Sequence, residues 1–366
     1  MTGTTATAPR AAGADDARGL ASRAGAEEGL GRWDAAARLY SLAFRASVMD
    51  RDLGSAVDAL RGQARVRRQQ HRLEEAEELA YLSFVLAEGN GFPQAAARAL
   101  NVRGIIRYEQ SDWAGAAALY GRALEMALDL GDDELAGLAC QNAGVIAHLR
   151  GDLFEARTRY LESIGSFVRS GNSAHAMMAY NNLGVASIYQ GEWMEAEVYF
   201  SRGIEIGERL SQSPVLARLY SNRAHPLIEI GETARARRSL DRAEEAARAV
   251  GDRGTLGEVE KFRAMLARSE GRLRDADEGL ERARQMSDAS STAFERAELL
   301  RESGHLREAQ GRAAEARAAY REAAGLYAEV GARRQLRLVE LRVAALVEQG
   351  EQYEDAGREE PGTRPG

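Results

Sequence analysis

The side chains that most often carry catalysis or bind metals are sparse in this sequence and scattered along it. They are His71, Cys140, His148, His175, His225 and His305. A zinc site on a helix needs two ligands three or four residues apart, and no pair here has that spacing. Cys140 and His148 are about two helical turns apart, too far for a base to activate a nucleophile directly. Phosphate-binding glycine loops and the Gly-x-Ser-x-Gly motif are also absent, so we expect no enzyme, no cofactor and no metal.

The composition describes a folded chain without an evident affinity for nucleic acid or membrane. The 366 residues are 45% hydrophobic and carry a formal net charge of −7, and neither end has a basic block. We therefore expect no nucleic-acid partner. No apolar run is long enough to cross a bilayer, and residues 1–10 lack the apolar core of a secretory signal. Cys140 permits no internal disulfide and Lys261 is the sole lysine among many arginines, so we expect a cytoplasmic, bacterial protein.

A forty-residue unit recurs along almost the whole chain. Each copy reads as two amphipathic helices, and the second helix opens near one of the register residues: Gly31, His71, Ser111, Gly151, Gly191, Gly231, Gly271 and Gly311. Alanine stands five residues after every register residue, a large residue usually nine after, and a small residue twelve after, all on one helix face. A small residue also stands seven before, which we attribute to close contact within the helix pair. The pattern predicts an all-α chain of stacked helix pairs.

The ends of the chain and one proline depart from this pattern. Residues 1–14 and 357–366 are rich in small, charged or proline residues, and we expect disordered tails around one repeat domain at 15–356. A ninth unit begins after Gly331. We expect its second helix to open at Gly350, which leaves residues 333–348 as a capping helix. Pro226 falls inside a predicted helix, where its missing N–H predicts a bend.

The pattern Asn-x-Gly…Gly-Asp-x-x-x-Ala…Tyr…Ala resembles the tetratricopeptide repeat. The resemblance covers residues 15–356 and implies a superhelix of about eight repeats plus a C-terminal capping helix. Forty-residue repeats of this kind are similar to those of Pins-type adaptors, kinesin light chain and bacterial peptide-sensing regulators. In that family the first helix of each pair lines a concave groove that holds a peptide from a partner, which implies a peptide-binding groove here.

The resemblance places groove residues thirteen, ten, nine and six positions before each register residue. In the middle of the chain these positions carry amides flanked by apolar residues: Asn101, Gln141, Asn142, Asn181, Asn182 and Asn222, with Val145, Val185 and Met178. Side-chain amides both donate and accept hydrogen bonds, so they can bind a peptide backbone of any sequence. Asparagine also belongs to the general repeat pattern, and the alternative is that these amides only bridge neighbouring helices.

The two ends of the predicted groove carry charge. The N-terminal end holds Arg61, Arg65 and Arg98, with Arg67, Arg68 and Arg72 close in sequence, and Arg218 stands at an equivalent position further along. Because arginine forks suit carboxylates, we expect an acidic stretch of the partner there, with a solvated helix face as the alternative. The C-terminal end is mixed, with Glu258, Glu298 and Glu302 beside Lys261 and Arg301, and with His225, Met265 and His305 in the six-before row.

The sequence supports two functions. The first is an adaptor or scaffold that holds a protein or peptide segment in its groove. The alternative is a signal-responsive regulator, similar to bacterial peptide-sensing repeat proteins. Those generally carry an output domain before the repeats, and only about fourteen residues precede the first helix here, so we expect any output to come from a partner. The sequence favours no oligomeric state.

Overall fold

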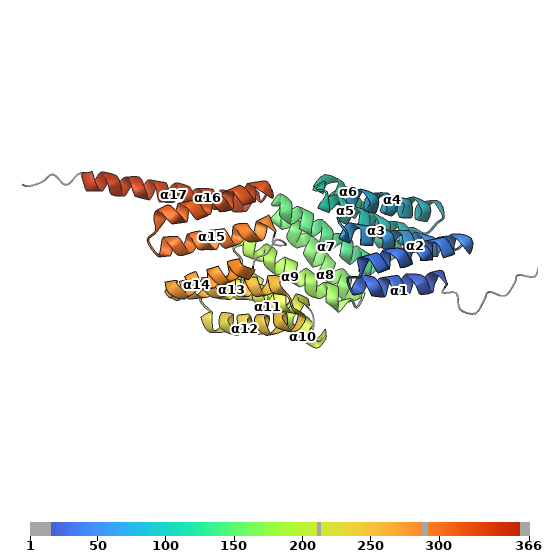
Figure 1. Ribbon diagram of the computed structural model, residues 1–366, viewed down its shortest axis with the longest axis horizontal. Helices are drawn as coiled ribbons and strands as arrows, with labels where there is room; N and C mark the ends of the chain where they lie inside the picture. The colour runs from blue at the N-terminus through green and yellow to red at the C-terminus, as the bar shows by residue number, and fades with distance from the viewer. Residues whose placement is uncertain (1–15, 211–213, 287–291, 359–366) are drawn as a thin grey trace, which may run out of the picture. The chain divides into compact units, whose positions relative to one another are not determined.

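The protein is built from α-helices throughout the part of the chain that the computed structural model describes, which is residues 16–210, 214–286 and 292–358. No strand occurs within these ranges. The helices, coloured from blue to red along the chain in Figure 1, are α1 Ala17–Gly29, α2 Trp33–Met49, α3 Leu53–Gln69, α4 Leu73–Gly89, α5 Pro93–Glu109, α6 Trp113–Leu130, α7 Asp133–Arg150, α8 Leu153–Arg169, α9 Ser173–Gln190, α10 Trp193–Leu210, α11 Pro214–Glu229, α12 Thr233–Val250, α13 Arg253–Ser269, α14 Leu273–Met286, α15 Ala293–Ala309, α16 Ala313–Glu329 and α17 Arg333–Arg358.

The turns between helices share one backbone feature that recurs every twenty residues. A residue with φ between 57° and 81° stands in each described turn: Gly31, Arg51, His71, Gly91, Ser111, Gly131, Gly151, Gly171, Gly191, Gly231, Gly251, Gly271, Gly311 and Gly331. The predicted register residues are thus the left-handed residues of the turns within pairs. Glycine adopts this conformation freely, whereas a side chain makes it unfavourable by about 1 kcal/mol. Three of these positions nevertheless carry a residue other than glycine, namely Arg51, His71 and Ser111.

Aspartates fix the starts of several helices. Asp16 accepts a hydrogen bond from the backbone N–H of Gly19 at 2.7 Å, and Asp132 accepts one from Leu135 at 3.0 Å. Asp252 accepts in the same way from Thr255. Each carboxylate satisfies a donor that has no partner inside the helix, so these residues set where the helix begins.

Small and large residues alternate in the core of each helix pair. The alanine five residues after each register residue is fully or almost fully buried in all eight copies: Ala36, Ala76, Ala116, Ala156, Ala196, Ala236, Ala276 and Ala316. The large residue nine after covers the small residue seven before, so that the ring of Tyr120 lies on Gly104 and that of Tyr320 on Gly304. In these pairs the large residue therefore fills space within its own helix pair, whereas the ring of Tyr40 lies on Gly62 of the next pair.

The chain divides into two compact units, and each consists of stacked helix pairs. The first comprises residues 1–146 and 165–172; in it α1, α3 and α5 are neighbours and pair with α2, α4 and α6. The second comprises residues 147–164 and 173–366, in which α9, α11, α13 and α15 are neighbours and pair with α10, α12, α14 and α16. Helix α17 packs on α16 at the end of the second unit.

The C-terminal helix departs from one expectation. Helix α17 runs from Arg333 to Arg358 without a turn at Gly350, so the second helix of a ninth unit does not form. A turn there would place Glu351 at the register position, where the left-handed conformation is unfavourable. The predicted tails, 1–14 and 357–366, lie outside the described residues except for the last two residues of α17. Helix α11 continues through Pro226, and the bend stays a prediction.

None of the described helices combines the length and the apolar character needed to cross a bilayer.

Candidate functional site

A cavity of about 720 Å³ opens on the first helices of the second unit. Its walls come from α9, α11, α13, α15 and α17, with the start of α10. Helix α11 contributes Arg218, Asn222, His225 and Glu229, which are spaced by four, three and four residues and so form one stripe along the helix. Volumes of this order are typical of sites that enclose a small molecule or part of a peptide.

One wall of the cavity is aromatic. Trp193, His225 and Phe262, which we call the aromatic shelf, stand with ring centroids 5.4 Å and 5.5 Å apart in that order. Met265 and Phe262 are almost completely buried at its base. Burial first, and the positive charge of Arg301 second, lower the pKa of His225 to about 4. The shelf is therefore uncharged at neutral pH and suits an apolar group.

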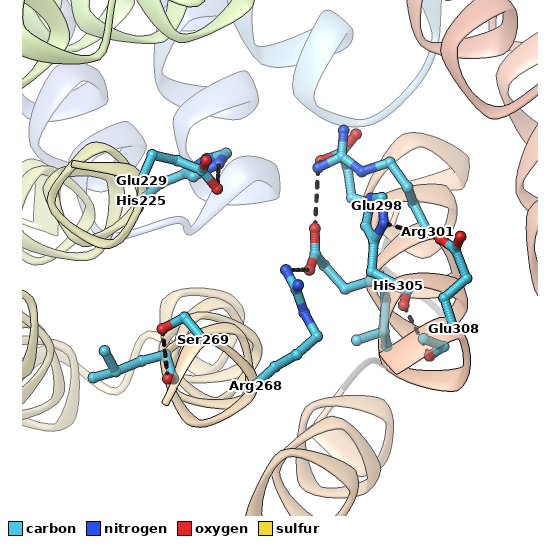
Figure 2. A network of polar contacts seen from close by, with 12 residues as sticks. His225, Glu229, Arg268, Ser269, Glu298, Arg301, His305 and Glu308 are labelled. Carbon is cyan, nitrogen blue, oxygen red and sulfur yellow. Dashed lines mark hydrogen bonds and ion pairs between the residues drawn. The ribbon is translucent and has the colours of Figure 1, made fainter. Parts of the chain in front are cut away.

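The cavity is also lined by an ionic network, which we define as Glu258, Lys261, Arg268, Glu298, Arg301 and Glu302; Nζ of Lys261 lies 4.8 Å from the ring centroid of Phe262. Lys261 contacts Glu258 at 2.5 Å, and Arg301 contacts Glu298 at 2.9 Å. Arg268 of α13 and Arg301 of α15 point toward the same space (Figure 2), where they meet Glu302 at 3.5 Å and 3.4 Å. Within this network each charge lies beside one of opposite sign.

The central carboxylate of this network is held ionised. Burial alone would raise the pKa of Glu302, but the charges of His305, Arg301 and Arg268 outweigh burial and lower the pKa to about 2. The pKa of Glu229, by contrast, is raised, first by burial and then by the charge of Glu302. Glu229 lies 4.0 Å from Nε2 of His225 (Figure 2).

Two tyrosines of α16 bond to side chains of α15, and one of them bonds to the ionic network. Tyr327 donates a hydrogen bond to Glu298 at 2.5 Å, and Tyr320 bonds to Glu308. The hydroxyl of Tyr320 also lies 2.8 Å from Nδ1 of His305. The network is thus tied to α16, the helix behind α15, which limits how far its side chains can rotate.

Two further arginines line the cavity without such a partner. Arg218 of α11 and Arg334 of α17 are both exposed. Among the described residues, no carboxylate lies within ion-pair distance of either guanidinium. They are therefore the lining cations whose charge is available to a ligand.

Comparison with known proteins identifies the fold. No family model and no curated protein match this sequence. Among solved structures, the chain is similar to a tetratricopeptide repeat protein from Parabacteroides merdae, with 18% identity and a TM-score of 0.54 over 78% of this chain and 98% of that chain. The fold is the tetratricopeptide repeat.

Two other similar structures are Rap proteins. The Rap conjugation gene regulator of plasmid pLS20, in complex with the Phr* peptide, matches with 15% identity and a TM-score of 0.57 over 78% of this chain and 77% of that chain. A Rap protein complexed with competence and sporulation factor matches with 12% identity and a TM-score of 0.55 over 91% of this chain and 98% of that chain. At such identities the likeness is one of fold alone.

Three of the predicted site residues line the cavity of this tetratricopeptide-repeat protein: Val185, Arg218 and Asn222. The others do not line it: Arg61, Arg65, Arg98, Asn101, Gln141, Asn142, Val145, Met178, Asn181 and Asn182. The four groove rows do supply much of the lining, but at the mixed C-terminal end. Trp193, which its position suggests is a packing residue, also faces the cavity, as do Phe294 and Arg334. No sequence signal distinguishes these three from packing or surface residues.

The predicted amides pair with one another along the tetratricopeptide array. Nδ2 of Asn142 donates to Oδ1 of Asn101 at 3.0 Å in the first unit, and Asn222 donates to Asn181 at 2.9 Å in the second. Each bond joins consecutive repeats. The alternative that these amides bridge neighbouring helices therefore accounts for all four residues. Each amide group still has donor or acceptor positions that the bridge does not use.

The arginines at the N-terminal end have carboxylates of their own. Arg61 contacts Asp58 at 2.7 Å, and Arg98 contacts Asp132 at 3.3 Å. Arg65 donates from Nε and Nη2 to Glu28 at 2.9 Å and 2.8 Å, and also contacts the hydroxyl of Tyr40. The remaining contacts are Arg67 with Glu75, Arg68 with Glu109 and Arg72 with Glu75. An acidic ligand at this end would have to displace these bonds, and that site stays a prediction.

Proposed function

We propose that this protein is a tetratricopeptide-repeat scaffold that holds a segment of a partner protein, or a peptide, in the cavity of its second unit. The observation that carries the proposal is the cavity itself, which opens on five consecutive first helices and combines an apolar wall with a charged one. Such a combination suits a segment with both polar and apolar side chains. Two similar structures support this, since each is a Rap protein in complex, one with the Phr* peptide and the other with competence and sporulation factor.

Site-specific photo-crosslinking tests the proposal. A benzophenone amino acid replaces Leu338, which lines the cavity and is 49% exposed, and in a matched variant it replaces Leu161 of α8, which is 45% exposed and lies outside the cavity lining. Both variants are incubated with peptides selected from a display library on the wild-type protein. We expect cross-links from position 338 and few from position 161.

A second variant checks that the cavity is needed for binding. Asn222→Trp adds a large side chain to the half-buried centre of the α11 stripe and should fill the cavity. We expect the selected peptides to lose binding to this variant while its circular dichroism spectrum is unchanged. Undiminished binding to Asn222→Trp, or equal cross-linking from both leucine positions, would refute the proposed function.

A signal-responsive regulator is the second candidate. It is favoured by one of the similar structures, the Rap conjugation gene regulator of plasmid pLS20. A regulator changes conformation with its ligand because the ligand binds one state more tightly than the other. X-ray scattering with and without a selected peptide separates the two: a change in radius of gyration favours the regulator, and an unchanged radius favours the scaffold.

A further inference from the structure

The charge that the cavity offers to a ligand differs from the charge of its lining as a whole. The acidic lining residues are Glu229, Asp252, Glu258, Glu295, Glu298 and Glu302, and the basic ones are Arg218, Lys261, Arg268, Arg301 and Arg334. These sets nearly balance. What a ligand meets depends on which of them are already bonded within the protein.

Most of the acidic lining residues already form hydrogen bonds or ion pairs within the protein. The three carboxylates of the ionic network are bonded to Lys261, Arg268 and Arg301, as described above. Asp252 accepts from the backbone N–H and the hydroxyl of Thr255, and Glu295 accepts from the backbone N–H of Thr292 in a capping box. Glu229 is the remaining acid, and it lies beside the aromatic shelf near His225.

The basic residues divide differently. Lys261, Arg268 and Arg301 are the cations of the ionic network, and their charges are compensated there. Arg218 and Arg334 are exposed and have no carboxylate partner among the described residues. A guanidinium group that no carboxylate of the protein occupies can bind a ligand carboxylate through two parallel hydrogen bonds.

The apolar part of the lining adds a second requirement. Trp193, His225 and Phe262 form a continuous shelf on three consecutive elements of the wall, with Met265 at its base. Along α11, Arg218 precedes His225 by seven residues, so the two lie about 10 Å apart along the helix axis. One ligand can therefore contact both the shelf and Arg218.

We propose that the segment bound in the cavity is acidic and carries a large apolar side chain, with its carboxylates paired to Arg218 and Arg334 and its apolar side chain on the aromatic shelf. This rests on the proposed function, and it names the chemistry of the partner for that same site. It also moves the expected acidic contact from the arginines around Arg61, which have carboxylates of their own, to these two arginines.

A peptide library of defined composition tests the inference. The probe is a mixture of N-acetylated, C-amidated octapeptides in which every position carries Asp, Lys, Asn, Leu or Phe. Peptides retained by the full-length protein on gel filtration are sequenced by mass spectrometry. We expect Asp to be enriched over Lys, with Leu or Phe enriched as well.

Two arginine pairs provide the variant and its control. In Arg218→Gln/Arg334→Gln the enrichment of Asp should disappear, while Leu and Phe stay enriched. The affinity for acidic peptides should fall by about threefold for each arginine removed, as expected of a partly exposed ion pair. In Arg238→Gln/Arg321→Gln, which removes exposed arginines of α12 and α16 outside the cavity lining, the Asp enrichment should persist.

The outcomes separate the inference from the proposed function. If wild-type protein retains peptides with no preference for Asp, the acidic-ligand inference is wrong and the scaffold proposal stands. The same holds if Arg218→Gln/Arg334→Gln keeps the preference for Asp. If wild-type protein retains no peptide, both fail. Thermal melts of the variants exclude loss of folding as the cause.

Discussion

Gly184 of α9 lies directly beneath the ring of Phe200 of α10, and a Cβ atom added to Gly184 would stand 2.6 Å from Cε1 of that ring. The two positions are sixteen residues apart, one on each helix of a pair. Gly104 and Gly304 lie under Tyr120 and Tyr320 in the same way. Where the large position is leucine, as in Leu240 and Leu280, the small position is alanine, at Ala224 and Ala264. The first pair, Ala24 with Tyr40, is an exception.

This relationship predicts a specific rescue. Gly184→Ala should lower the free energy of unfolding by about 2 kcal/mol, because the rigid ring cannot move away from the added methyl group. Phe200→Leu combined with Gly184→Ala should recover part of that loss. Urea denaturation followed by circular dichroism measures both. Gly325→Ala is the control: nothing lies near this exposed helical glycine, so alanine should stabilise the protein by up to about 1 kcal/mol. Equal effects at Gly184 and Gly325 would contradict the packing argument.

The turns predict a stabilising substitution. His71 and Ser111 hold φ of 57° and 62° at positions where most other turns have glycine. Glycine at either position should raise stability by about 1 kcal/mol and the melting temperature by about 2–4 °C. Gly311→Ala should instead lower the melting temperature, because no neighbour lies within contact of the added carbon and only the backbone conformation is affected. A lower melting temperature for His71→Gly would show that its side chain contributes more than its backbone conformation costs.

The amide bridge between repeats should be measurable as a coupling energy. Asn222 donates to Asn181, which is 8% exposed, so Asn222→Ala leaves a buried amide without its partner and Asn181→Ala leaves a half-buried one. In a double-mutant cycle with Asn181→Ala and Asn222→Ala, we expect about 1 kcal/mol of coupling from unfolding measurements. Additive effects would mean that the bond contributes nothing to stability and would return Asn222 to a role in binding alone.

Acid should destabilise the second unit, beginning below about pH 6.5. The pKa of His225 is lowered to about 4 by burial, so between about pH 4 and 6.5 the folded chain binds fewer protons than the unfolded chain. Stability is therefore complete above that window and falls as the pH falls, by up to about 3 kcal/mol. The lowered pKa of Glu302 adds a loss in the same direction below about pH 4.5.

Substitution of this histidine provides the test. His225→Phe keeps an aromatic ring on the shelf and removes the titration, so the melting temperature should fall less between pH 7 and pH 5 than in the wild type. A wild-type slope in His225→Phe would mean that other groups determine the acid sensitivity.

The architecture could be predicted from the sequence because it follows from local periodicity. Alanine five residues after each register residue identifies the buried face of every second helix, and glycine with aspartate identifies the turns. Such signals act over fewer than twenty residues, within one helix and its turn. The exception, the missing turn at Gly350, occurs where the register position falls on Glu351, for which the left-handed conformation is unfavourable.

The site could be predicted only in part, since its properties depend on contacts between repeats. The groove rows supply about half of the cavity lining, yet the sequence alone could not distinguish Arg61, which is bonded to Asp58, from Arg218, which is not bonded to a carboxylate. Arg268 meets Glu302 across thirty-four residues, and Asn222 meets Asn181 across forty-one. The sequence by itself determined the repeat, its turns and its core, because these depend on residue types at fixed short spacings. Only the tertiary structure decided which charges and amides are already bonded, because that depends on where side chains of successive helices meet.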